Sequence, residues 1–124
     1  MNSAYVNTIS VDDQPPYPGD IALEKKIENI NRWNAMAMVL QGADNGLGVG
    51  GHIATYASAA TMMEVGYNHF FRKRSENYGG DLVMTQPHAA PGVYAREYLA
   101  GRISEQQLKT FRRQLQPGGG LSSY

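Results

Sequence analysis

The chain has 124 residues, no cysteine, and 11 basic against 11 acidic residues, so its formal net charge is zero. This length suits one small domain. The lack of cysteine excludes disulfides and thiolate metal sites and fits a reducing cytoplasm. The charge balance argues against a dedicated nucleic-acid or membrane-surface binder, which would carry a basic excess. The N-terminus is polar, so no secretory signal is expected, and no apolar run is long enough to span a membrane.

Residues 1–19 are predicted to form an extended arm, because its second half contains several prolines and a Pro-Gly turn signal. A helix is predicted over roughly 20–41, with Asp20 as its N-cap. Apolar residues recur there at steps of three and four and predict its inward face. They are Leu23, Ile27, Ile30, Trp33, Ala37 and Leu40. We expect Trp33 to be a core anchor, since tryptophan is usually buried.

A glycine-rich loop over 42–51 leads into His52 and a second helix predicted over 55–74. The loop lacks the preceding strand of a dinucleotide fingerprint, so a flexible connector is the simpler interpretation. The first half of the helix is rich in small residues, which suits close packing. The second half carries bulky residues expected to fill a core: Met63, Tyr67, Phe70 and Phe71. His69 is expected to be structural, held by a backbone or side-chain partner.

The apolar run 82–84 predicts the only strand of the chain. One strand is not a sheet. The strand therefore needs a partner outside the chain, through oligomerisation or because the sequence is a piece of something larger. The predicted fold class is an α/β fragment, mostly helical with one strand.

Two further helices are predicted after this strand. The third covers 91–100, with Pro91 at its first position and Gly101 just past its end. The fourth begins with a capping box, in which Ser104 is the N-cap and Gln107 lies three residues later. Its inward residues are expected to be Leu108, Phe111 and Leu115.

His52 and His88 each stand at the start of a predicted helix, and we expect the rest of the chain to bring them together. Free backbone N–H groups and the positive end of a helix favour an anion there. A neutral imidazole can donate to a phosphate or move a proton near neutral pH. Two alternatives stay open: His88 as a loop histidine touching a backbone carbonyl, and a metal site built from His52, His69 and His88.

Short stretches over nearly the whole chain resemble the homodimeric type of pyruvate dehydrogenase, a thiamine-diphosphate-dependent enzyme. They match in order and spacing, and they are 5–9, 17–19, 32–35, 50–54, 68–72, 79–83, 91–96 and 120–124. The resemblance implies an arm over 1–19. Residues 20–124 would be the front part of a transketolase-like, thiamine-diphosphate-binding domain that is incomplete at its C-terminus.

The family enzyme is a cytoplasmic homodimer that binds thiamine diphosphate and magnesium between two subunits. It decarboxylates pyruvate and passes the acetyl group to a lipoyl group on the acetyltransferase component, linking glycolysis to acetyl-CoA. By resemblance, the cofactor-binding residues are His52, Thr55, Gln86 and His88, and the catalytic residues are His52, His88 and Tyr124. Pro87 stands where the family commonly has glycine, which puts the approach of His88 in question.

The resemblance also implies that parts of the site lie outside this chain. The family's magnesium motif and its activating glutamate would lie beyond Tyr124, and its N-terminal docking segment would precede the chain. The fragment alone is therefore expected to be inactive. Its expected partners are the remaining dehydrogenase polypeptide, a second subunit and the lipoyl-bearing acetyltransferase. The alternative is a non-catalytic helical interaction module derived from that enzyme.

Overall fold

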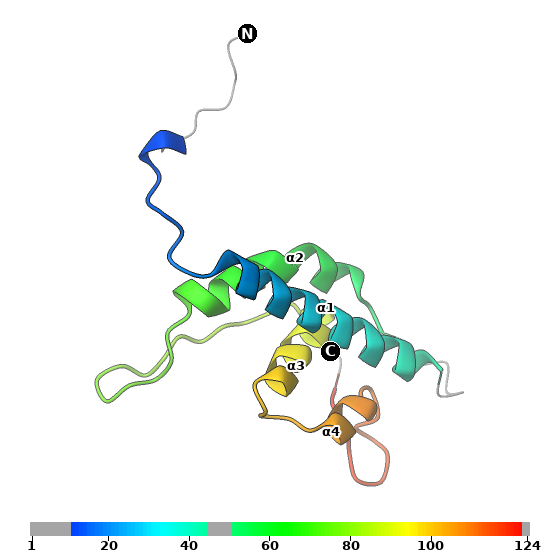
Figure 1. The fold of residues 1–124 in the computed structure, drawn as a ribbon. Helices are drawn as coiled ribbons and strands as arrows, with labels where there is room; N and C mark the ends of the chain where they lie inside the picture. Colours follow the sequence, from blue (N-terminus) through cyan, green and yellow to red (C-terminus); the bar gives the residue numbers. More distant parts are fainter. Residues whose placement is uncertain (1–10, 45–50, 123–124) are drawn as a thin grey trace.

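The structure of the chain is a computed structural model that describes residues 11–44 and 51–122. The described residues form four α-helices, which are α1 (Ile21–Ala43), α2 (Ala54–Val65), α3 (Ala90–Leu99) and α4 (Glu105–Lys109). Three short helices accompany them, namely η1 (Val11–Asp13), the π-helix η2 (Gly66–Phe70) and η3 (Pro87–Ala89). The long α1 contacts α2, α3 and α4, and the segment before it projects away from the bundle (Figure 1).

The predicted extent of α1 is confirmed, but the prediction of which residues face the core is wrong. The Asp20 carboxylate accepts a hydrogen bond from the Leu23 N–H at 3.0 Å, which fixes the helix start. The buried residues are Asn31, Ala35, Met38, Val39 and Gly42. Trp33 is 66% exposed, so it is not a core anchor. Ala35 and Gly42 on the buried face let neighbouring helices come close, whereas Leu23, Trp33 and Leu40 of the predicted face are exposed.

Two clusters of buried side chains hold the helices together. One consists of Ala35, Tyr56, Ala60, Ala89 and Ala95. The other consists of Met38, Val39, Leu108 and Phe111. Leu108 and Phe111 are thus buried as predicted. Leu115 is 93% exposed, contrary to the prediction, because α4 ends at Lys109 and no helix carries Leu115 inward.

The second predicted helix is shorter than its sequence pattern suggests. After α2, the π-helix η2 adds one wide turn, closed by a hydrogen bond of 2.7 Å from the Phe71 N–H to the Gly66 carbonyl. Phe71 is already extended, so residues 71–74 are not helical. Met63 and Tyr67 are half-buried, whereas Phe70 is 69% exposed and fills no core in the described structure.

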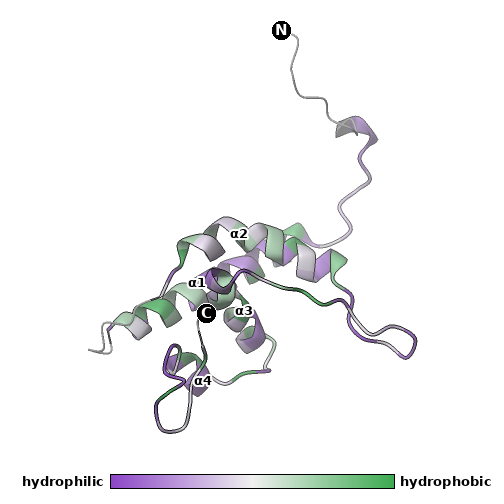
Figure 2. Cartoon of the chain, turned by 180° about the vertical axis from the view of Figure 1, so that it is seen from behind, coloured by the Kyte–Doolittle hydropathy of each residue, from purple (hydrophilic) through white to green (hydrophobic). Residues whose placement is uncertain are grey.

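The predicted strand is not formed. Among the described residues the only β-pairing is an isolated bridge between Ser75 and Tyr78. Leu82 and Met84 are 89% and 87% exposed, and the backbone of 82–85 makes no backbone hydrogen bond to any described residue. The loop after η2 reaches away from the helices, and its limb that returns toward α3 is partly apolar (Figures 1 and 2). A strand needs a neighbour to pair with, and the described chain provides none.

The last two helices largely follow the prediction. α3 begins one residue earlier than expected, at Ala90, so Pro91 is its second residue. Gly101 has a φ of 73° directly after the C-cap Ala100. At the start of α4 the capping box is confirmed, because the Gln107 N–H donates to Ser104 Oγ at 3.2 Å and the Ser104 N–H donates to Gln107 Oε1 at 2.8 Å.

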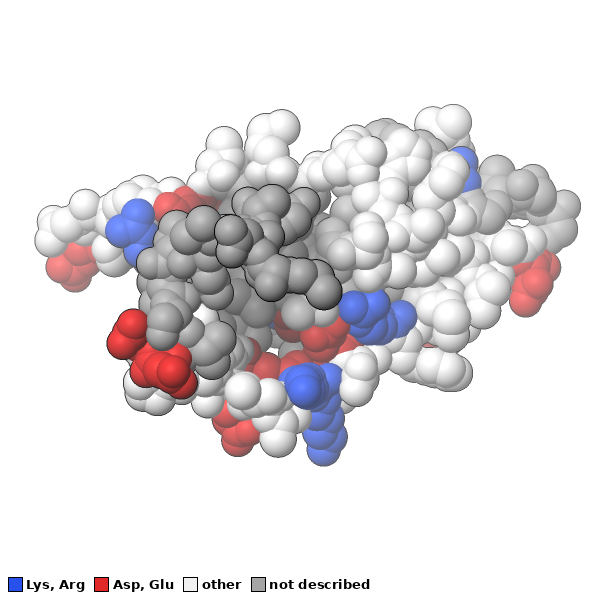
Figure 3. Space-filling model, turned by 90° about the horizontal axis from the view of Figure 1, so that it is seen from above, with Lys and Arg blue, Asp and Glu red and all other residues white. Residues whose placement is uncertain are grey.

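Acidic and basic side chains both appear on the face shown in Figure 3, in keeping with the zero net charge. Within the described ranges, no helix has the length and apolar character needed to cross a membrane.

Candidate functional site

The structure brings His52 and His88 together, as the sequence predicted. Their ring centroids are 4.6 Å apart, and the ring planes meet edge to face at 76°. His52 lies two residues before the start of α2, and His88 lies in η3, which runs directly into α3. Two helix starts that are distant in the sequence therefore meet at one imidazole pair.

Thr55 follows His52 by three residues, and Gln86 precedes His88 by two. Thr55 is in the first turn of α2, and Gln86 is the N-cap of η3. Both side chains line a groove of about 720 Å³ between α2, η2 and the extended segment before η3. Among the described residues, no charged side chain and neither histidine lines the groove, whose walls are mainly apolar and include Met62, Phe70 and Val83. Tyr124 lies outside the described residues.

This arrangement is suited to an anionic ligand. Imidazole N–H groups, a hydroxyl and an amide are hydrogen-bond donors, and none of these four side chains adds a negative charge. The starts of α2 and of η3–α3 contribute the positive ends of their backbone dipoles. Phosphate groups match both features.

The three-histidine metal site is not formed. His69 lies in a different polar network from the His52–His88 pair, and the described part of the chain contains no group of three His, Asp or Glu side chains placed to hold a metal ion.

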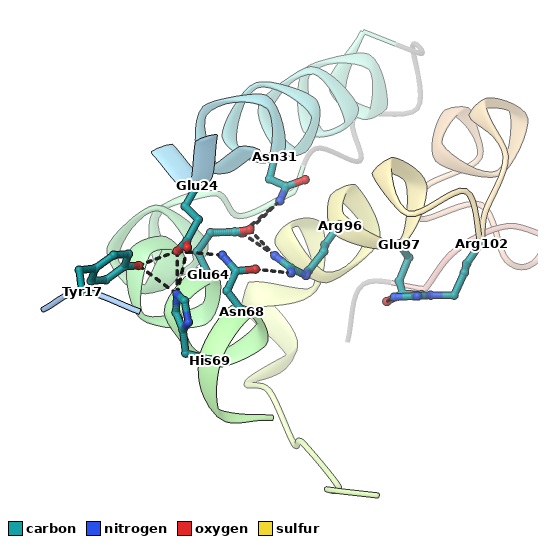
Figure 4. A network of polar contacts seen from close by, with 9 residues as sticks. All are labelled: Tyr17, Glu24, Asn31, Glu64, Asn68, His69, Arg96, Glu97 and Arg102. Carbon is teal, nitrogen blue, oxygen red and sulfur yellow. Dashed lines mark hydrogen bonds and ion pairs between the residues drawn. The ribbon is translucent and has the colours of Figure 1, made fainter. Parts of the chain in front are cut away.

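His69 has side-chain partners, as expected for a structural histidine. Its Nε2 lies 2.9 Å from Glu24 Oε2 and 3.0 Å from the Tyr17 hydroxyl, and that hydroxyl donates to Glu24 Oε2 at 2.5 Å (Figure 4). The hydrogen bonds from Tyr17 and then from His69 hold the pKa of Glu24 below its ordinary value. The contacts fasten the end of the N-terminal arm to η2.

A second carboxylate, Glu64, is buried where α1, α2 and α3 meet. Arg96 Nη1 donates to its Oε2 at 2.7 Å, and Asn31 Nδ2 donates to both of its oxygens at 3.2 Å. Asn68 joins the two halves of the network: it accepts from Arg96 Nη2 at 2.8 Å and donates to Glu24 Oε2 at 3.3 Å (Figure 4). The network ties three helices to η2.

Sequence reasoning missed the Glu64 contacts. The available signal was a single carboxylate in the apolar run of Met62, Met63 and Val65, since a charge there needs a buried partner. The sequence does not identify Arg96 as that partner, because it lies 32 residues away on another helix.

The comparison with known proteins agrees with the motif series. No protein-family model matches the chain. The chain is 56% identical over 124 residues to the pyruvate dehydrogenase E1 component of Haemophilus influenzae, which covers all of this chain and 14% of that protein. It is 51% identical over 122 residues to the pyruvate dehydrogenase E1 component of Escherichia coli, covering 98% of this chain and again 14% of the relative.

A third relative, from Pseudomonas aeruginosa, is 48% identical over 124 residues. It too carries the name pyruvate dehydrogenase E1 component, and the chain again spans 14% of its length. Along its whole length the chain therefore matches one segment of the pyruvate dehydrogenase E1 component, as the motif series predicted, and it spans 14% of that protein.

Proposed function

We propose that this chain forms part of the thiamine-diphosphate site of a pyruvate dehydrogenase. His52, Thr55, Gln86 and His88 contact the diphosphate, and Tyr124 faces the substrate. The observation that carries the proposal is the His52–His88 pair, with ring centroids 4.6 Å apart at the starts of two helices. The identity of 48% to 56% with E1 components supports it.

The residues present fit the diphosphate end of this cofactor. Two imidazoles, a hydroxyl and an amide offer neutral or cationic donors, and no carboxylate of the described residues lines the groove at Thr55 and Gln86. When bound, thiamine diphosphate supplies the carbanion for attack on a 2-oxo acid. The chain's own residues bind and orient the diphosphate, and the His88 imidazole can hold or pass a proton.

The remaining requirements are proposed to come from other polypeptide. The magnesium ligands, the activating glutamate and a second subunit are supplied from outside these 124 residues, so the chain alone is inactive. The acetyl group goes to the lipoyl-bearing acetyltransferase component. A reducing cytoplasm is the proposed location, which suits a chain without cysteine.

The extended segment before η3 supports a close association with the remaining dehydrogenase polypeptide. Leu82 and Met84 are exposed, and the backbone of 82–85 makes no backbone hydrogen bond to any described residue. An extended segment with free N–H and C=O groups is a template for pairing with another strand. We propose that a strand of the companion polypeptide pairs here and covers the apolar groove.

The test is a graft. The chain replaces the matching segment of the Haemophilus influenzae relative, and pyruvate decarboxylation is measured with thiamine diphosphate and magnesium. The graft should be active. His52→Ala and His88→Ala should each lower the rate by about 10²-fold or more, the usual contribution of a positioned acid–base group. Leu115→Ala, at a side chain that is 93% exposed, is the control and should leave the rate unchanged.

Two results would contradict the proposal. One is a folded graft without activity, and the other is full activity in both histidine variants. The first would favour the non-catalytic interaction module. The second would keep the dehydrogenase origin and remove these histidines from its site.

A further inference from the structure

We infer that Tyr56 is a positioning residue, whose ring sets the distance between His52 and His88. That this spacing of the imidazoles serves to bind a diphosphate rests on the proposed function. That Tyr56 sets the spacing does not. Tyr56 lies in α2 and is only 4% exposed. Its burial raises the pKa of its hydroxyl to about 12, with the Glu64 carboxylate adding to the effect. The Tyr56 hydroxyl is therefore protonated, and the side chain uncharged, at neutral pH.

Tyr56 is the only large side chain of its buried cluster among the described residues. The other members are Ala35 of α1, Ala60 of α2, Ala89 of η3 and Ala95 of α3. Alanines bring backbones close but cannot adjust to fill space. Ile53 and Met63 pack against the cluster but are only partly buried, so the Tyr56 ring is its one large buried side chain. We expect the volume of this ring to set how closely α1, η3 and α3 approach α2.

The ring lies directly against the backbone of α3 at Gly92. A Cβ atom at position 92 would stand 2.0 Å from both Cδ2 and Cε2 of Tyr56, so only glycine permits this contact. Tyr56 follows His52 by four residues, and Gly92 follows His88 by four. The contact thus joins the first turns of the two helices whose starts carry the imidazole pair.

The same cluster also holds the immediate neighbours of both histidines. Ala89, which follows His88, is a buried member of it, and Ile53, which follows His52, packs against it. Each imidazole is therefore attached to a backbone segment that packs in or against the cluster that contains the Tyr56 ring. A change in the volume of that ring should move the two imidazoles relative to each other.

The test measures the imidazole–imidazole contact by NMR, using the full chain with labelled histidine. Gly92→Ala forces its new methyl group into the Tyr56 ring and should weaken or abolish the nuclear Overhauser effect between His52 and His88. Gly79→Ala is the matched control, because nothing lies within 4 Å of a Cβ there, and it should leave the effect unchanged. Tyr56→Phe keeps the ring and should also leave it unchanged.

The double variant Tyr56→Leu with Gly92→Ala makes room for the added methyl group and should restore the contact at least in part. The contact between His69 and Tyr17 reports on the remaining fold in every sample, since neither residue belongs to the Tyr56 cluster. An unchanged His52–His88 signal in a folded Gly92→Ala chain would overturn the inference. So would a double variant that shows no rescue. Neither readout involves thiamine diphosphate, so failure of the proposed function would leave this result standing.

Discussion

At the scale of single residues, the Glu64–Arg96 ion pair is the polar contact whose loss we expect to lower the free energy of unfolding most. The Glu64 side chain is 7% exposed, and that of Arg96 is 21% exposed. Removing one partner of a buried pair leaves an unpaired buried charge, which costs about 3–5 kcal/mol. We predict that Arg96→Ala lowers the free energy of unfolding by an amount in this range, as measured by urea denaturation.

The matched control is Arg102→Ala. Arg102 pairs with Glu97, but its side chain is 62% exposed, and exposed pairs contribute only about 0–1 kcal/mol. Equal losses in the two variants would show that the pair at Glu64 is not a buried anchor of the fold.

Glu24 gives a prediction for acid conditions. Hydrogen bonds from Tyr17 and His69 lower its pKa in the folded chain. A lowered folded pKa stabilises the fold above the unfolded value, near 4.5, and this stabilisation is lost as the pH falls through the folded pKa. We predict that Glu24→Gln lowers Tm at pH 6 and that the difference from wild type shrinks below about pH 4.5. Parallel Tm curves from pH 6 to pH 3 would contradict this.

At the scale of elements, the extended segment 82–85 differs from its neighbours. Its backbone makes no backbone hydrogen bond to a described residue, whereas the adjacent Asp81 N–H donates to the Arg72 carbonyl at 2.9 Å. We predict that amide hydrogens at 82–85 exchange with solvent faster than that of Asp81 in the isolated chain. Hydrogen exchange followed by NMR measures this, and protection of all four amides in the isolated chain would contradict it.

The same segment shows where sequence reasoning about elements succeeds and fails. Local signals such as the Asp20 cap and the Ser104 capping box were read correctly, because their physics lies within four residues of sequence. The prediction of a strand at 82–84 was wrong, because a strand forms only where a neighbouring strand can pair with it, and an apolar run alone does not provide one.

The prediction of which face of α1 is buried was wrong for a related reason. Periodicity identifies an apolar stripe, but it does not say what covers that stripe. In the described structure Trp33 and Leu40 are 66% and 55% exposed, whereas Asn31 is buried because Glu64 accepts its hydrogen bonds. A face chosen by hydropathy alone misses a polar residue whose partner lies on another helix.

At the scale of the whole molecule, the pairing of His52 with His88 was predictable and the scaffold behind it was not. Both histidines precede helices, and that pattern is visible in the sequence. The ring of Tyr56 among four alanines, and its contact with Gly92, join residues that no local pattern connects. The chain also exposes a mainly apolar groove, and it spans 14% of the length of its relatives.

The central claim is that His52 and His88 bind a diphosphate within a site that other polypeptide completes. Calorimetric titration of thiamine diphosphate with magnesium tests it most directly, using the chain alone and the graft in the Haemophilus influenzae relative. The chain alone should bind weakly or not at all. In the graft, His52→Ala and His88→Ala should each raise Kd by about tenfold or more, because a hydrogen bond to a charged group contributes about 1.5–3 kcal/mol. An unchanged Kd in both variants would contradict the claim.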